Sequence, residues 1–257
     1  MAACSGVLHV THSTGRCSAC LDGQALDFSI SMAFQPIVDV ANRQVFAHEA
    51  LVRGVAGEGA GQVLARVTDD NLYSFDQACR ITALEWAARL ALPARLSINF
   101  MPNAVYKPET CIRATLAAAE RVGFPLDRII FEVTEQERVR DTAHLLDILR
   151  SYREMGFRTA IDDFGAGYAG LNLLADFQPD IIKLDMHLIR DVDRDPVRQV
   201  LARTMIDLCR QLNVEVIAEG IETAGEYRYL SEQGVRLFQG YLFTKPAFQA
   251  LPEISLP

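Results

Sequence analysis

The sequence is poor in cysteine, has no long apolar run and carries no excess of positive charge. Six cysteines among 257 residues are too few for a disulfide scaffold. No run of about 18 apolar residues could span a membrane, and no basic segment followed by an apolar run marks a signal peptide. We therefore expect a cytoplasmic protein without a membrane segment.

The charge balance excludes a further class of partner. A net charge of -8 is unfavourable for a DNA-binding protein, because binding to the phosphate backbone requires a basic surface. A small anionic ligand remains possible where a metal ion supplies the missing positive charge. No strand-like segment is followed by G-x-G-x-x-G or by a Walker A loop, which argues against an open nucleotide-binding sheet.

The N-terminal segment differs from the rest of the chain. Residues 1–28 show no clear hydrophobic periodicity, and we interpret them as a flexible leader that precedes a single domain at 29–257. Cys17 and Cys20 form the motif CSAC in this leader. Because a second C-x-x-C is absent, we favour a flexible segment over the alternative of a zinc or redox site.

From about residue 30, short β-rich segments alternate with amphipathic helices. Strands are expected at 31–40, 44–53, 95–100, 128–135, 158–164, 180–185, 214–220 and 235–243. Helices are expected at 74–91, 111–124, 141–157, 169–177, 196–212 and 223–234. This repeat favours an α/β fold, a modified (β/α)8 TIM-like barrel, over an open doubly wound sheet. Only a short turn separates the first two strands, so one of them is expected to be antiparallel.

Oxygen-bearing side chains and one lysine occur where these strands end. They are Glu49, Asn99, Glu132, Asp162, Asp163, Lys183, Asp185, Glu219 and Gln239. In a β/α barrel all these strand ends open onto one face. A single acid after a strand is usually a helix N-cap, but several adjacent carboxylates cannot all stay ionised without a cation. Because the set contains no His or Cys, it points to Mg²⁺ or Mn²⁺.

The adjacent pair Asp162 and Asp163 sharpens this prediction. Successive strand residues face opposite ways, but a turn at the strand end, permitted by Gly165 and Gly167, would bring both carboxylates into the site. One carboxylate could then bridge two ions about 3.5–4 Å apart, an arrangement suited to phosphoester hydrolysis. Lys183 could orient the attacking water or stabilise phosphate charge. The residues alone therefore predict metal-assisted hydrolysis of a phosphate ester.

Several motifs occur in a fixed order over residues 30–250. They are HEALVRG, NFMPN, FEVTE, IDDFGAGYAGL, DIIKLD, AEGIET and FQGYLFTKP. Together they resemble the EAL-domain family of bacterial cyclic di-GMP phosphodiesterases. The resemblance implies that the domain at 29–257 hydrolyses cyclic di-GMP to linear pGpG with two Mg²⁺ or Mn²⁺ ions and a metal-activated water. It also implies inhibition by Ca²⁺ and assembly as a homodimer.

The resemblance further implies roles for individual residues. The implied metal ligands are Glu49, Asn99, Glu132, Asp162, Asp163 and Glu219. The implied catalytic pair is Glu219, as general base or second-metal ligand, and Lys183, which would hold the hydrolytic water. The implied substrate contacts are Gln35, Leu51, Arg53, Gln239 and Pro246, and Glu222 would anchor the loop that follows the Asp pair.

Two features depart from the family pattern. The loop reads DDFGAGYAG where many members read DDFGTGYSS, so Ala166 and Ala169 lack hydroxyls that could fix it and Gly170 adds freedom. His48 precedes Glu49 and is expected to face away from the metals, because adjacent strand residues alternate in direction.

Two other functions compete with an active phosphodiesterase. The first is a catalytically weak or inactive cyclic di-GMP receptor or protein-interaction module. Such proteins usually lack a metal ligand or the base, and this sequence keeps them all, so catalysis is favoured. The second is an unrelated barrel enzyme in which Mg²⁺ polarises a carboxylate substrate and a lysine abstracts a proton.

Overall fold

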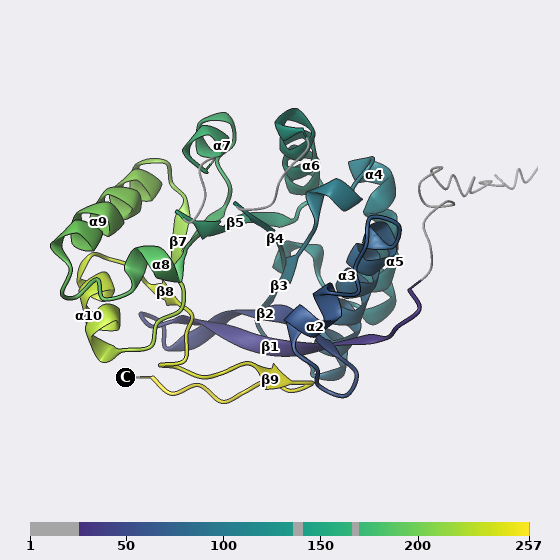
Figure 1. The fold of residues 1–257 in the computed structure, drawn as a ribbon, viewed down its shortest axis with the longest axis horizontal. Coiled ribbons are helices and arrows are strands. Elements are labelled where there is room, and N and C mark those ends of the chain that lie inside the picture. The colour runs from purple at the N-terminus through teal and green to yellow at the C-terminus, as the bar shows by residue number, and fades with distance from the viewer. Residues whose placement is uncertain (1–25, 136–140, 166–169, 257) are drawn as a thin grey trace, which may run out of the picture.

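A computed structural model of the chain describes residues 26–135, 141–165 and 170–256. Residues 1–25 of the predicted leader, with Cys17 and Cys20, lie outside the described residues, as do Ala166 and Ala169 of the altered loop. The strands form one nine-stranded sheet, in which β1 to β8 close into a barrel (Figure 1). They are β1 (Ile30–Asp39), β2 (Gln44–Gly54), β3 (Arg95–Asn99), β4 (Ile129–Thr134), β5 (Arg158–Phe164), β6 (Ile181–Leu184), β7 (Glu215–Ala218), β8 (Leu237–Phe238) and β9 (Ala247–Phe248).

One strand runs against the others. β1 pairs antiparallel with β2 and with β8, whereas the successive pairs from β2 to β8 are parallel. The turn between β1 and β2 is too short for the crossover that a parallel pair requires. Its geometry is fixed by Asp39, whose carboxylate accepts hydrogen bonds from the backbone and side chain of Asn42. The predicted modified barrel, with an antiparallel strand near its start, is confirmed.

Helices cover the outside of the barrel (Figure 1). They are α2 (Ala60–Leu64), α3 (Leu72–Arg89), α4 (Pro108–Cys111), α5 (Arg113–Val122), α6 (Thr142–Glu154), α7 (Gly170–Asp176), α8 (Met186–Ile189), α9 (Pro196–Gln211) and α10 (Ala224–Glu232), with 3-10 turns η1 (Pro102–Ala104) and η2 (Leu126–Arg128). The sequence did not predict α2, α4 or α8, because helices of four or five residues are too short to show an apolar period. Among the described residues, no helix is both long and apolar enough to cross a membrane.

The last predicted strand, at 235–243, is wrong in extent, since β8 comprises only Leu237–Phe238. The chain turns at Gly240, whose carbonyl accepts hydrogen bonds from the N–H groups of Phe243 and Thr244. A Cβ at Gly240 would lie only 2.1 Å from the carbonyl oxygen of Ile221. The strand therefore stops where two backbone segments approach too closely for any side chain.

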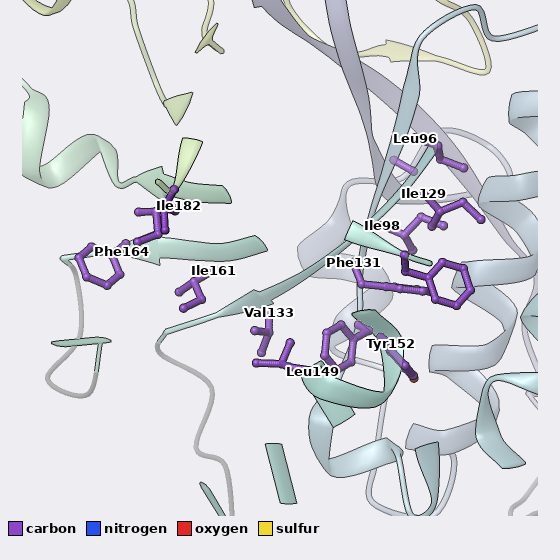
Figure 2. Packing of buried hydrophobic residues seen from close by; sticks show 14 of the residues in the cluster. Leu96, Ile98, Ile129, Phe131, Val133, Leu149, Tyr152, Ile161, Phe164 and Ile182 are labelled. Carbon is purple, nitrogen blue, oxygen red and sulfur yellow. The ribbon is translucent and has the colours of Figure 1, made fainter. Parts of the chain in front are cut away.

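Two apolar layers form because strand residues alternate between the faces of the barrel wall. The outer layer lies between strands and helices, where Phe131 and Val133 of β4 meet Leu149 and Tyr152 of α6 (Figure 2). The inner layer fills the barrel and consists of Ile37, Phe46, Ala47, Ile130, Ala160, Ile181, Ile217 and Leu237. Phe46 joins its neighbour Ala47 in this layer because the pairing of β1 with β2 has a bulge there, which interrupts the alternation. Polar side chains follow two residues later on the same strands, as with Ile130 and Glu132, so the inner layer forms the floor of a polar site.

Candidate metal and substrate site

Lys183 lies at the centre of this polar site. Its side chain is 1% exposed, and its ammonium Nζ contacts four carboxylates from four strand ends. The nearest are Glu219 at 2.7 Å and Glu132 at 2.9 Å, followed by Asp162 at 3.1 Å and Glu49 at 3.5 Å. These side chains converge because the parallel strands of a barrel surround one axis and their carboxyl ends open onto the same face.

Neutral side chains orient two of these carboxylates. Asn99 and Gln239 each donate a side-chain hydrogen bond to Glu49, both at 2.8 Å. Ser97 donates to Oε1 of the buried Glu132. The sequence interpretation overlooked Ser97, although it lies two residues before Asn99 on β3 and therefore shares its inward direction.

The Asp pair reaches the site through a distortion of β5. Asp163 has a left-handed backbone, with φ of +54°, and the register between β5 and β6 shifts between Ile161 and Phe164. The two carboxylates, which a regular strand would point in opposite directions, therefore both line the same cleft. The turn thus begins at Asp163 itself and continues at Gly165, where φ is +98°.

The carboxylates form two groups that could each hold a divalent cation. Ligand oxygens of Glu49, Glu132 and Asp162 lie within 4.8 Å of one another, and so do those of Asp162, Asp163 and Glu219. Asp162 belongs to both groups. An all-oxygen donor set suits hard cations such as Mg²⁺ and Mn²⁺, so the residues fit the metals that the sequence predicted.

The charge in this site is out of balance. Burial, together with the carboxylates of Glu49 and Asp162, raises the pKa of Glu132 to about 8 despite the opposing charge of Lys183. Burial, followed by Asp162, also raises the pKa of Glu219 well above its usual range. Although burial alone would lower the pKa of Lys183, the surrounding carboxylates raise it well above its ordinary value. One ammonium cannot neutralise so many carboxylates, and bound cations would correct the deficit.

Asp163 responds to the same excess of negative charge at the edge of the site. Burial, followed by the charges of Asp162 and Asp185, raises its pKa to about 6. Asp185 itself caps α8 by accepting a hydrogen bond from the N–H of His187. One of the predicted strand-end acids is therefore engaged as a helix N-cap.

The carboxylates open into a cleft of about 310 Å³. Its lining includes Gln35, Glu222 and Gln239, together with Met186 and Tyr241, which the sequence interpretation did not identify. Met186 directly follows Asp185, and Tyr241 lies two residues after Gln239. Their positions just after β6 and β8 were the sequence signal that could have identified them.

The remaining predicted substrate contacts lie elsewhere. Leu51 lines a neighbouring, more apolar cavity of about 370 Å³. Arg53 and Pro246 line neither cavity, and the Arg53 guanidinium donates to the carbonyl of Val52 at 2.7 Å.

Comparison with known proteins shows which family this barrel belongs to. The sequence model of the EAL domain matches residues 24–246. The chain belongs to the EAL domain family. The cyclic di-GMP-bound structure of a standalone versatile EAL protein from Vibrio cholerae O395 shows 52% identity and a TM-score of 0.87, covering 90% of this chain and 98% of that one.

Two larger proteins contain a similar domain. The manganese and cyclic di-GMP complex of Klebsiella pneumoniae BlrP1 has 35% identity and a TM-score of 0.83, covering 90% of this chain. The blue light- and temperature-regulated antirepressor BluF of Escherichia coli K12 is 32% identical over 240 residues, 92% of this chain. The chain spans 60% of the length of each of these two proteins.

In this EAL domain, Glu222 pairs with Arg190 at 3.1 Å. The loop that Glu222 was expected to anchor includes residues 166–169, which lie outside the described residues. His48 is buried, and burial lowers its pKa to about 4. It does not line the cleft, in agreement with its expected outward direction.

Proposed function

We propose that this EAL domain is a cyclic di-GMP phosphodiesterase that forms linear pGpG with two Mg²⁺ or Mn²⁺ ions. The observation that carries the proposal is the pair of carboxylate groups sharing Asp162, with Lys183 between them. Family membership supplies the substrate class, and the complexes of the Vibrio and Klebsiella proteins with cyclic di-GMP support it.

The described residues divide between the two cations. Glu49, Glu132 and Asp162 would hold one, with Asn99 beside Glu49, and Asp162, Asp163 and Glu219 would hold the other. When bound, such cations supply Lewis-acid stabilisation of phosphate charge and lower the pKa of a water.

Lys183 and Glu219 would carry the proton chemistry. Their charged atoms lie 2.7 Å apart, so both can reach one water molecule. The raised pKa of Lys183 keeps its ammonium charged at neutral pH, able to donate a hydrogen bond to the attacking water or to phosphate. The carboxylate of Glu219, which contacts Lys183 directly, would accept a proton of that water. The water oxygen bonds to phosphorus as Glu219 takes its proton, the P–O3′ bond breaks, and the leaving oxygen takes a proton from solvent water to become the free 3′-hydroxyl of pGpG.

Substrate recognition is assigned to the cleft beside the carboxylates. Gln35 and Gln239 already line it, and Leu51 lines the adjoining cavity. Arg53 would have to release the Val52 carbonyl to reach a phosphate oxygen, where a guanidinium binds well. Pro246 immediately precedes β9.

The decisive experiment is incubation of the purified protein with cyclic di-GMP, followed by chromatography of the products. We expect pGpG with Mg²⁺ or Mn²⁺, and none when Ca²⁺ replaces them. Glu49→Ala and Lys183→Ala should abolish turnover while circular dichroism shows a folded protein. Glu120→Ala and Lys107→Ala, at exposed positions, serve as matched controls and should be active. Binding of cyclic di-GMP without pGpG in either metal would overturn the proposal.

The similarity to BluF supports a second candidate, because that protein is named as an antirepressor. The chain would then be a cyclic di-GMP receptor or a protein-interaction module. The same experiment separates the two, since a receptor binds cyclic di-GMP in calorimetry and yields no pGpG.

We also propose that the domain forms a homodimer in the cytoplasm. The family resemblance implies a dimer, and an apolar stripe on α9 also supports one. In this stripe Val197, Val200 and Leu201 are 66%, 53% and 45% exposed. Sedimentation equilibrium should give a dimer mass that Val200→Glu lowers. A monomer at every concentration tested would refute the dimer.

A further inference from the structure

The loop that follows β7 lies directly on α8. Gly220 has a left-handed backbone, with φ of +62°, and a Cβ there would lie 2.5 Å from Cβ of Met186. This loop begins after Glu219, whereas α8 begins three residues after Lys183. The two segments that leave the proposed catalytic pair are therefore packed against each other without room for a side chain.

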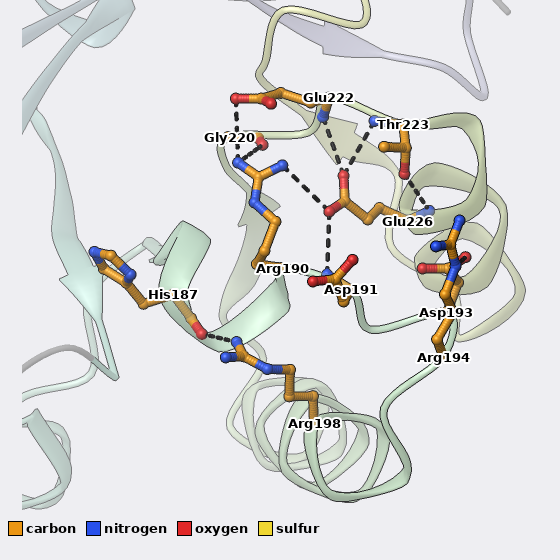
Figure 3. A network of polar contacts seen from close by, with 10 residues as sticks. All are labelled: His187, Arg190, Asp191, Asp193, Arg194, Arg198, Gly220, Glu222, Thr223 and Glu226. Carbon is orange, nitrogen blue, oxygen red and sulfur yellow. Dashed lines mark hydrogen bonds and ion pairs between the residues drawn. The ribbon is translucent and has the colours of Figure 1, made fainter.

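Arg190, at the end of α8, makes three polar contacts across this junction (Figure 3). Its guanidinium lies 3.1 Å from Oε1 of Glu222 and 3.3 Å from Oε1 of Glu226, and it donates to the carbonyl of Gly220 at 3.4 Å. The Arg190 side chain is 27% exposed, and the residue does not line the cleft. It reaches the site only through the residues that it holds.

Glu226 ties the same two segments through their backbones. It is 1% exposed, and its Oε2 accepts from the N–H groups of Glu222 and Thr223, both at 3.1 Å. Its Oε1 accepts from the N–H of Asp191 at 3.2 Å. Burial alone would raise the pKa of Glu226, but these hydrogen bonds and the charge of Arg190 lower it, so the carboxylate is ionised. One buried carboxylate thus binds the chain after α8 and the chain after β7.

From these contacts we infer that Arg190 is a positioning residue for the site. Together with Glu226 it forms a clamp, defined by these two residues, that fixes the 220–223 loop against α8 and directs the Glu222 carboxylate along the wall of the cleft. The functional part of the inference rests on the proposed phosphodiesterase activity. It assigns to Glu222 a partner, Arg190, among the described residues.

The clamp should matter for turnover because Glu219 immediately precedes the clamped loop. Loss of Arg190 removes the cation paired with Glu222 and the donor to the Gly220 carbonyl, which frees the backbone next to the proposed base. Misplacement of a catalytic group by about 1 Å can cost roughly 100-fold in rate. The proposed cation ligands other than Glu219 lie on or next to other strands, β2 to β5.

The first test compares Arg190→Met with Arg190→Lys. The matched control is Arg194→Met, since Arg194 lies four residues later and is 78% exposed, and within the described part of the chain its side chain pairs only with the neighbouring Asp193, at 3.2 Å. With cyclic di-GMP and Mn²⁺, we expect Arg190→Met to lower kcat about 10- to 100-fold with less than a threefold change in KM. Arg190→Lys should recover part of kcat, and Arg194→Met should match the wild type. An unchanged kcat in Arg190→Met would overturn the inference.

A double-mutant cycle separates positioning from general loss of stability. If Arg190 acts through Glu222, Arg190→Met should lower kcat much less in a Glu222→Gln background than in the wild type. An equal loss in both backgrounds would overturn the assigned route. Assays well below the melting temperature of each variant exclude unfolding as the cause.

Hydrogen exchange tests the clamp independently of catalysis. Amide exchange in a peptide covering residues 220–226 should accelerate at least tenfold in Arg190→Met and in Glu226→Gln, and not in Arg194→Met. Unchanged exchange in both variants would refute the clamp. If the wild-type protein forms no pGpG, the proposed function fails, and the exchange experiment still decides whether the clamp exists.

Discussion

Replacing Arg80 of α3 by methionine should destabilise the protein by about 3–5 kcal/mol, because it leaves a buried carboxylate without its cation. Arg80 and Asp76 have side chains 0% and 1% exposed, and their charged atoms lie 2.7 Å apart. Arg80 also donates to the hydroxyl of Tyr152 at 2.8 Å. After the substitution, Asp76 keeps a hydrogen bond from the N–H of Met101 at 2.9 Å and a weak one from Gln77.

The magnitude follows from what methionine can and cannot replace. Its side chain can fill most of the volume beside the rings of Phe100, Phe131 and Tyr152, so a large cavity is not expected. It cannot neutralise Asp76, and removing one partner of a buried ion pair costs about 3–5 kcal/mol. The lost hydrogen bond to Tyr152 is worth about 1 kcal/mol, within that range.

The loss should depend on pH in a defined direction. Burial raises the pKa of Asp76 even though Arg80 opposes the shift, and without Arg80 the pKa must rise further. An acid whose pKa is higher in the folded state binds its proton more tightly there, so protonation of Asp76 stabilises the folded protein. This contribution to the free energy of unfolding is fully present below the unfolded pKa of about 3.9. It is then lost as the pH rises toward the folded pKa, by up to about 1.4 kcal/mol per pH unit. The deficit of the variant relative to wild type should therefore be smaller at pH 5 than at pH 8.

Urea unfolding of metal-free protein at both pH values, followed by circular dichroism, measures these free energies. Adding Asp76→Asn to the variant removes the stranded charge and should restore part of the stability. Arg121→Met is the control, because Arg121 forms an exposed pair with Glu85 and should change stability by less than about 1 kcal/mol. A deficit for Arg80→Met below 1 kcal/mol, or one independent of pH, would refute the reasoning.

Three further substitutions test the packing, the loop and the metal ligands. Phe131→Ala should cost about 3–5 kcal/mol in urea unfolding, because Phe131 is fully buried against Tyr152 and Phe157; a loss below 1.5 kcal/mol would contradict the packing described here. Gly220→Ala should cost about 1–3 kcal/mol in the same assay through backbone strain and its contact with Met186, and wild-type stability would show that the loop can move away. Glu132→Gln should weaken Mn²⁺ binding at least about tenfold in calorimetry. In the wild type that affinity should rise with pH toward 8, because the cation displaces the Glu132 proton, and a flat pH profile would be inconsistent with the raised pKa.

The Asp162–Asp163 pair shows how far the sequence reached into the site. The βα repeat placed both residues at the end of a barrel strand, and the shortage of positive charge there predicted cations. The left-handed backbone of Asp163, which turns its carboxylate into the cleft, was outside the reach of the pattern because few residues other than glycine adopt that conformation. The contact of Arg53 was also outside the reach of the pattern. Its guanidinium donates a hydrogen bond to the Val52 carbonyl of the same strand, although its position in the motif implies a substrate contact.

By itself, the sequence determined the modified barrel and the chemical type of the site. Apolar periodicity fixes which side chains point inward, and parallel strands bring their ends to one face, so Glu49, Glu132 and Lys183 had to converge. Only the tertiary structure decided the partners of each group. Gln239 and Glu49 are 190 residues apart, and Arg190 and Glu226 are 36 apart, yet each pair is bonded. Periodicity records the direction of a side chain from its own backbone, whereas the group it meets depends on how distant segments pack.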